Sequence, residues 1–184
     1  MILLEVIKTE VEGLLIIKPK VFADERGYFF ESYNRRTWAE AGVQIDFVQD
    51  NQARSCKGVL RGLHYQLGRP QAKLVRVVRG EVFDVAVDMR RDSPTLGRWA
   101  GALLSAANRR MMWIPPGFAH GFYVTADSAE FVYKCTDFYA PEHEVALRWD
   151  DPAIGIPWPL VDGQPPLLSA KDAAGLGFAE APKL

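Results

Sequence analysis

A histidine and a lysine stand close together in the chain, outside any metal-ligand pattern. His64 lies in the segment GVLRGLHYQ at 58–66, and Lys73, nine residues after it, begins the run KLVRVVRGEVFDVAVD. A neutral imidazole, with a pKa of about 6.5, is the usual general base at neutral pH, and a lysine ammonium is a compact charge that can stabilise an enolate oxygen. The pair predicts proton abstraction next to a carbonyl group.

Both residues also have structural alternatives: a hydrogen-bonded structural histidine and a solvated lysine at a strand end. Counting alternation from Leu60 places Gly62, His64 and Gln66 on one strand face, and Lys73 on one face of the following strand. A barrel can point both groups inward, where they would share one site.

Length, composition and charge limit the class of protein. A chain of 184 residues with 48% hydrophobic and 24% charged residues predicts one domain over residues 1–184. Lys+Arg total 22 against 23 Asp+Glu, so we expect neither nucleic-acid nor membrane binding. Cys56 and Cys135 lack CxxC spacing, which argues against a disulfide framework or a zinc site and fits a reducing compartment.

The N-terminal segment MILLEVIKTE contains two glutamates, so we expect neither a signal peptide nor a membrane helix there. No later apolar run approaches the length needed to cross a membrane. These features predict a cytoplasmic protein.

Most segments alternate with a two-residue period and are short, rich in Val, Phe, Tyr and Trp, and bounded by turn residues. They are LLIIKPKVF, GYFFESY, KLVRVVRG, EVFDVAVD, RWAGALLSA, MMWIPP, GFYVT and AEFVYKCTDFY. The pattern predicts an all-β sandwich or barrel.

Helical signals are few. Thr37 with Glu40, and Ser169 with Asp172, form capping-box patterns that predict two short helices. Five prolines between residues 151 and 166 forbid a central strand, so we expect a long loop over the barrel there.

Two segments resemble the paired motifs of the cupin superfamily. The segment IPPGFAHGF at 114–122 resembles the second motif and carries His120, while Gly58 and His64 fit the first. A histidine after PGFA also has a structural alternative, in which it only satisfies a buried loop. The resemblance implies a jelly-roll fold.

The first motif departs from the cupin pattern at two metal-ligand positions. Gln66 replaces the second histidine, and Lys73 stands in the glutamate position counted back from Gly80. An ammonium among the ligands would repel a metal ion, so we expect no metal.

Nearly the whole chain resembles a narrower family, the dTDP-4-dehydrorhamnose 3,5-epimerases. The segments that carry the resemblance are DERGYFFESYN, FVQDN, GVLRGLHYQ, KLVRVVRGEVFDVAVDMR, SPTLG, WIPPGFAHGF, YKCTDFYAPEHE, WDDPAIGIPWP and LSAKDA. The resemblance implies a cupin-type jelly roll with a few short helices. It also implies a homodimer in which N-terminal residues of one subunit help complete the site of the other.

The implied activity is epimerisation of dTDP-4-dehydro-6-deoxy-D-glucose at C3 and C5 to dTDP-4-dehydro-β-L-rhamnose, in dTDP-L-rhamnose biosynthesis. The ketone at C4 acidifies the hydrogens at both carbons, so the reaction needs a base, a stabiliser for the enolate oxygen and an acid on the opposite face. No cofactor is expected.

By resemblance, His64 is the base and Lys73 lies near the C4 oxygen. Asp172 matches the carboxylate that orients the histidine, a role that fixes the tautomer and stabilises the imidazolium. Asp172 has a structural alternative as part of the capping box with Ser169, and Asp84 is a rival carboxylate for the same role.

Tyr133 matches the proton donor of the family, and Tyr139 matches the residue that stacks on thymine. A phenol with a pKa near 10 stays protonated at neutral pH and can deliver a proton opposite His64. A flat aromatic ring with a wet edge suits stacking. For either tyrosine, ordinary packing is the structural alternative.

Further polar residues match ligand-binding positions of the family, and surface solvation is the alternative for each. They are Arg26, Glu31, Gln49, Asp50, Asn51, Arg61, His120, Glu144 and Lys171. Simple alternation puts Arg61 and His64 on opposite faces, and a bulge at Gly62 would resolve this conflict.

Three other functions fit parts of the pattern. Some relatives invert only C3 or only C5 of another dTDP-4-keto-deoxysugar. A metal-dependent cupin oxygenase or isomerase would need a further ligand where Gln66 and Lys73 stand. A sugar-nucleotide binder without catalysis would have no use for His64, Lys73 and Tyr133 together.

Overall fold

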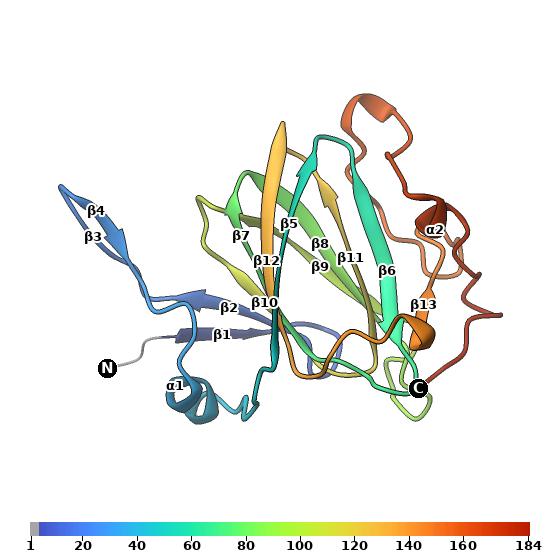
Figure 1. The fold of residues 1–184 in the computed structure, drawn as a ribbon, viewed down its shortest axis with the longest axis horizontal. Helices are drawn as coiled ribbons and strands as arrows, with labels where there is room; N and C mark the ends of the chain where they lie inside the picture. Colours follow the sequence, from blue (N-terminus) through green and yellow to red (C-terminus); the bar gives the residue numbers. More distant parts are fainter. Residues whose placement is uncertain (1–3) are drawn as a thin grey trace.

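The computed structural model describes residues 4–184, so the first three residues of the predicted domain and of the N-terminal segment lie outside it. Two antiparallel sheets pack face to face (Figure 1). One sheet contains, in spatial order, β1 (Leu4–Lys8), β2 (Leu15–Pro19), β10 (Met111–Ile114), β7 (Lys73–Arg79), β12 (Ser128–Cys135) and β5 (Gln49–Cys56). The other contains β13 (Glu144–Ala146), β6 (Leu60–Gln66), β11 (Phe118–Val124), β8 (Glu81–Asp88) and β9 (Trp99–Ser105).

The remaining elements are short. The strands β3 (Phe22–Asp24) and β4 (Gly27–Phe29) form a hairpin of their own. The helices are α1 (Arg35–Glu40) and α2 (Ala170–Ala173), with 3-10 turns η1 (Pro141–His143) and η2 (Val161–Gly163). The prediction of an all-β sandwich with a few short helices is confirmed. Within residues 4–184, no helix is long and apolar enough to span a membrane.

The main core fills one part of the space between the two sheets. Inward residues of β7, β8, β11 and β12, among them Val75, Val82, Phe122 and Phe131, are buried together. The rings of Phe122 and Phe131 stack with centroids 4.3 Å apart, which joins the two layers. This packing fixes the distance between the sheets next to the polar residues described below.

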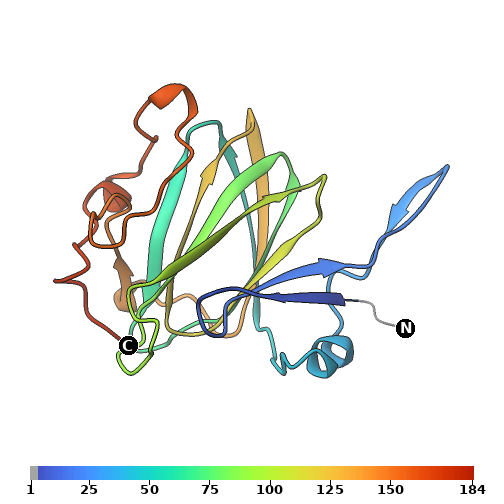
Figure 2. The same cartoon turned by 180° about the vertical axis from the view of Figure 1, so that it is seen from behind.

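The proline-rich segment runs as an irregular loop over the outer face of the five-stranded sheet (Figures 1 and 2). Trp158 packs edge-on against Phe83 of β8, with ring centroids 5.8 Å apart, and its indole N–H donates to the Trp149 carbonyl at 2.8 Å. The predicted loop over the barrel is confirmed. Its burial against the sheet brings the following helix α2 close to β6.

The N-terminal part differs from the sandwich. The β3–β4 hairpin projects away from the body of the protein in both views (Figures 1 and 2). Helix α1 begins after Asn34, whose side chain accepts from the backbone N–H groups of Arg36 and Thr37. The predicted start at Thr37 was therefore wrong, because Asn34 is the cap and the Thr37 hydroxyl donates to Glu31 instead.

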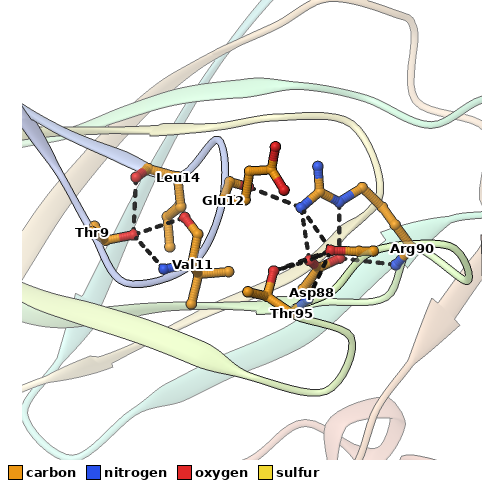
Figure 3. A network of polar contacts seen from close by, with 8 residues as sticks. Thr9, Val11, Glu12, Leu14, Asp88, Arg90 and Thr95 are labelled. Carbon is orange, nitrogen blue, oxygen red and sulfur yellow. Dashed lines mark hydrogen bonds and ion pairs between the residues drawn. The ribbon is translucent and has the colours of Figure 1, made fainter.

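A buried carboxylate ties the β1–β2 turn to the loop after β8 (Figure 3). Asp88 is fully buried and binds the guanidinium of Arg90 through Nε at 2.9 Å and Nη2 at 2.7 Å, and Thr95 Oγ1 donates to it at 2.7 Å. Arg90 also donates to the carbonyl of Glu12 at 2.8 Å. These hydrogen bonds, together with one from Ser93, lower the pKa of Asp88 to about 2 despite its burial.

Candidate active site

A cavity of about 760 Å³ opens between the two sheets. Its volume suits a ligand of the size of a small organic molecule or nucleotide. Its lining includes these residues singled out in the sequence: Gln49, Asn51, Arg61, His64, Lys73, His120, Tyr133, Tyr139, Glu144, Lys171 and Asp172. The structure thus brings together most of the predicted site, from strands of both sheets, the loop after β12 and helix α2.

A bulge in β6 places Arg61 and His64 on the same cavity. Arg61 pairs with Phe122 of β11, and His64 pairs with His120, so two residues of β6 oppose one of β11. Gly62 lies in this bulge with φ +125°, and a Cβ there would come within 2.5 Å of the Gly121 Cα. Only glycine allows the strands to approach so closely. The predicted bulge at Gly62 is confirmed.

His64 lies against a buried carboxylate supplied by α2. Its Nε2 atom is 2.6 Å from Asp172 Oδ1, and the imidazole is only 21% exposed. The oxygen sits off the ring N–H direction, so this is a close polar contact rather than a well-aligned hydrogen bond. The other ring nitrogen, Nδ1, lies 3.8 Å from Glu144 Oε1. The ring therefore lies between two carboxylates.

Asp172 performs the capping role and faces His64 at the same time. The Ser169 hydroxyl accepts from the Asp172 backbone N–H at 3.2 Å and donates to its Oδ2 at 2.6 Å. The Gly62 N–H donates to Oδ1 at 3.3 Å. Burial raises the pKa of this carboxyl, but His64, Ser169 and Gly62 outweigh it and lower the pKa to about 2. Asp172 is therefore ionised at neutral pH.

Asp84, the rival carboxylate, contacts a different histidine. Both of its oxygens lie 3.0 Å from His120 Nε2, and the aspartate is completely buried. Burial raises the pKa of Asp84 and lowers that of His120, which disfavours charge on both. His120 pairs with His64 in register, so two histidine–aspartate pairs lie side by side on neighbouring strands.

Lys73 and Tyr133 face the cavity from the sheet opposite His64. In the register of β7 and β12, Lys73 pairs with Cys135 and Tyr133 pairs with Val75, two residues along. Neither the Lys73 ammonium nor the Tyr133 hydroxyl has an ion-pair or hydrogen-bond partner among residues 4–184. Burial lowers the pKa of Lys73 and raises that of Tyr133. The phenol therefore stays protonated at neutral pH.

Glu144 of β13 connects the histidine with two binding residues. Its Oε2 accepts from the Tyr139 hydroxyl at 2.9 Å and from Lys171 Nζ at 2.8 Å. Burial raises the pKa of Glu144, but Lys171, Tyr139 and His64 together lower it. A carboxylate with these partners fixes the Tyr139 ring and the Lys171 ammonium at the cavity edge.

The residues at the cupin metal positions do not fit a metal ion. The Gln66 amide is engaged by backbone groups, with Nε2 donating to the Arg69 carbonyl at 2.8 Å and Oε1 accepting from the Ala140 N–H at 3.0 Å. Lys73 occupies the position of the expected carboxylate and carries a positive charge. Within residues 4–184, no group of three or more His, Cys, Asp or Glu side chains is placed to hold a metal ion.

Three predicted binding residues lie elsewhere in this chain. Arg26 sits at the tip of the projecting hairpin, where it pairs with Asp24, and Glu31 accepts from Asn34 and Thr37 at the start of α1. Asp50 points to the outer face of β5. It forms an ion pair with Lys134 at 2.9 Å. The cavity of a single chain does not include these three side chains.

Comparison with known proteins shows the family of the chain. The family model described as dTDP-4-dehydrorhamnose 3,5-epimerase matches residues 8–180. The dTDP-4-dehydrorhamnose 3,5-epimerase of Pseudomonas aeruginosa is 59% identical over 172 residues, which cover 93% of this chain and 94% of that protein.

Solved structures share the fold over almost the entire chain. The dTDP-6-deoxy-D-glucose-3,5-epimerase of Legionella pneumophila, in complex with dTDP-4-keto-L-rhamnose, has a TM-score of 0.93 and 50% identity, covering 98% of each chain. A 3'-monoepimerase from Streptomyces bikiniensis, in complex with dTDP-quinovose, has a TM-score of 0.86 and 35% identity, covering 93% of this chain and 86% of that one.

These likenesses confirm the predicted cupin-type jelly roll. The greater identity lies with the 3,5-epimerases, at 59% and 50% against 35% for the monoepimerase, which favours double over single epimerisation. This chain is an isomerase that belongs to the dTDP-4-dehydrorhamnose 3,5-epimerase family.

Proposed function

We propose that this chain inverts C3 and C5 of dTDP-4-dehydro-6-deoxy-D-glucose to give dTDP-4-dehydro-β-L-rhamnose, with His64 as the base and Tyr133 as the acid. The observation that carries the assignment is the placement of His64, backed by Asp172 at 2.6 Å, across the cavity from Lys73 and Tyr133. Inversion requires removal of a proton on one face and its return on the other, and two facing sheets supply both faces.

Each epimerisation then proceeds in two proton transfers. The imidazole removes the hydrogen next to the C4 ketone through the ring nitrogen turned away from Asp172, and the ionised aspartate stabilises the imidazolium. The Lys73 ammonium lies near the C4 oxygen and stabilises the negative charge that develops there. Tyr133 delivers a proton to the opposite face of the same carbon. The four residues that take part in this sequence all line the cavity.

The rest of the cavity binds the nucleotide. Tyr139 is 52% exposed and presents a ring face for stacking on thymine. Arg61 and Lys171 supply positive charge for the diphosphate, and Arg61 is oriented by a hydrogen bond from its Nε to Ser55 Oγ at 3.0 Å. Gln49, Asn51, His120 and Glu144 supply polar groups for the sugar hydroxyls and the base edge.

The chain works as a homodimer in the cytoplasm under this proposal. Arg26 and Glu31 match binding positions of the family but lie outside the cavity of their own chain. Arg26 lies on the β3–β4 hairpin, an arm that projects from the body, and Glu31 follows this arm in the chain. The arm exposes Tyr28 by 57% and Phe29 by 69%, which suits contact with a second copy. An exchanged arm would bring Arg26 and Glu31 to the cavity of the partner, with phosphate and hydroxyl groups as their targets.

The central test is incubation with the keto sugar nucleotide in deuterated water. Deuterium at both C3 and C5, with formation of the L-rhamno product, is the expected result, and His64→Ala should abolish both. His143→Ala is the matched control, since this histidine lies outside the cavity lining. Uptake at a single carbon would indicate a monoepimerase, and no uptake by the wild-type protein would contradict the proposal.

The arm exchange has its own test. Arg26→Ala and His64→Ala should each be inactive alone, but a mixed dimer contains one site with both residues intact. Mixing the two variants after dissociation should therefore restore part of the activity. Mixtures that stay inactive while mixed dimers form would contradict the exchanged arm.

A further inference from the structure

The segment after β12 carries Tyr139 out into the cavity mouth. Phe138 is 55% exposed and Tyr139 is 52% exposed, so neither is held by burial of its own ring. The two residues belong to an irregular stretch between β12 and η1. An exposed aromatic side chain on such a stretch would lose conformational freedom on binding a base, unless other contacts fix it beforehand.

Hydrogen bonds from two strands fix the backbone of this stretch. Gln66, which is only 5% exposed, accepts from the Ala140 N–H at 3.0 Å and donates to the carbonyls of Arg69 at 2.8 Å and Phe138 at 3.4 Å. Gln49 Oε1 accepts from the Tyr139 N–H at 2.9 Å. The backbone is thus held immediately before, at and after Tyr139.

The pattern of partners requires an amide at position 66. Two backbone carbonyls face Nε2 and one backbone N–H faces Oε1, so a flipped amide would set oxygen against oxygen. A carboxylate in the same place would repel both carbonyls, and an apolar side chain would leave the buried Ala140 N–H and the two carbonyls without this partner. Gln66 therefore does a task that neither glutamate nor methionine, its closest equivalents in length, can perform.

We propose that Gln66 is a positioning residue for nucleotide recognition, which holds Tyr139 in the orientation that stacks on the base. Gln66 stands two residues after His64 on the same strand, so the strand that carries the base also anchors the nucleotide-stacking loop. At this position, where cupins carry a metal ligand, Gln66 instead anchors a loop. The inference rests on the proposed function in one respect, the stacking role of Tyr139.

The test measures binding of dTDP, which needs no turnover. Gln66→Glu should raise the Kd for dTDP about tenfold, the order of the loss when a stacking aromatic is removed. It should raise the KM for the sugar nucleotide to a similar extent and change kcat less than twofold, because the loop touches no reacting carbon. Gln164→Glu, an exposed change in the loop before α2, is the matched control and should alter none of these values.

A double-mutant cycle separates positioning from general stability. Tyr139→Ala should itself raise the Kd about tenfold, and adding Gln66→Glu to it should cause little further change. A full tenfold effect of Gln66→Glu in the Tyr139→Ala background, or an unchanged Kd in a folded Gln66→Glu protein, would overturn the inference. Gln66→Met, which is uncharged, replaces the glutamate variant if a buried carboxylate prevents folding.

The two proposals fail in different ways. A wild-type protein that binds dTDP but exchanges no deuterium would contradict the epimerase mechanism and leave the role of Gln66 standing. A wild-type protein that epimerises its substrate, with a Gln66→Glu variant of unaltered KM and dTDP affinity, would contradict the role of Gln66 alone.

Discussion

His64 and Tyr133 face one cavity from opposite sheets of the sandwich. Facing sheets lie about 10 Å apart, which leaves room for a sugar ring between the two side chains. A proton can therefore leave from one side of a ring carbon and return to the other. In the proposed mechanism, this placement of base and acid on opposite sides of the ring gives inversion.

Tyr133→Phe separates proton removal from inversion. The base should still exchange hydrogen on its own face, while delivery from the other face is lost. We expect deuterium uptake into unreacted substrate to continue and the rate of epimerised product to fall by roughly 10²–10³-fold. Mass spectrometry of substrate and product measures both, and equal losses of exchange and inversion would contradict the assignment of Tyr133 as the acid.

Asp172→Asn tests the orientation of the base. The asparagine keeps the size of the side chain and an acceptor for the Gly62 N–H, but it cannot stabilise an imidazolium. We expect kcat to fall by roughly 10²–10⁴-fold with little change in the affinity for dTDP. Asp84→Asn is the comparison, since Asp84 contacts His120 rather than His64. A larger loss of kcat in Asp84→Asn would reverse the two assignments.

Lys73 should give the reaction an alkaline limit. Burial lowers the pKa of this ammonium below its ordinary value of 10.5, whereas burial raises that of Tyr133 above 10.0. As pH rises, Lys73 therefore loses its proton at a lower pH than an ordinary lysine, and kcat should fall with it. Lys73→Met should lower kcat by roughly 10²–10³-fold and remove this limb from the pH profile. A limb that persists in Lys73→Met belongs to another group.

The charge of Asp84 should shift that same limb. Its carboxylate raises the pKa of Lys73, as do Cys135 and Glu144, while Lys171 lowers it. Removing the charge in Asp84→Asn should therefore move the alkaline limb of kcat to lower pH. Glu130→Gln, on a partly exposed carboxylate outside the cavity lining, is the control. A limb that moves upward or stays fixed in Asp84→Asn would contradict the electrostatic coupling.

Asp88 should stabilise the fold in a pH-dependent way. Its pKa falls from 3.8 to about 2 on folding, so its contribution is complete above pH 3.8 and is lost as pH falls through about 2. The contribution is on the order of 2 kcal/mol. In urea unfolding, Asp88→Asn should be less stable than the wild type at pH 7, and the gap should narrow toward pH 2. A constant gap across that range would contradict this account.

The sheets were largely predictable from alternation, with one informative exception. In β12, alternate residues such as Ala129 and Phe131 are buried in the apolar core, so the sequence of this strand shows the period. Strand β5 reads QDNQARSC and shows no apolar alternation, because its inward residues face the cavity and its outward residues face solvent. A strand at the edge of a sheet that lines a polar site therefore shows little of the apolar alternation by which strands are predicted.

The contacts within the site could not be predicted from the spacing of residues in the sequence alone. The family resemblance linked Asp172 to His64, whereas the residues alone favoured a helix cap, and the structure shows that one side chain meets both requirements. Gln66 was recognised only as a missing metal ligand, and its backbone partners in the loop after β12 follow from tertiary packing. Arg26 and Glu31 lie outside the cavity of their own chain, so the structure of a single chain does not explain why they match binding positions of the family.

The bulge in β6 is also a constraint on the site that is distinct from the identity of its side chains. If the bulge closed at constant length, Arg61 and His64 would stand three residues apart in a regular pleat, and the residues on one side of the former bulge would exchange cavity and outer faces. Arg61 and His64 would no longer meet at one site, although every side chain named in the mechanism would still be present. We therefore expect this segment to tolerate some substitutions beside the catalytic residues but none that removes the bulge, because the bulge determines which residues of the strand face the cavity.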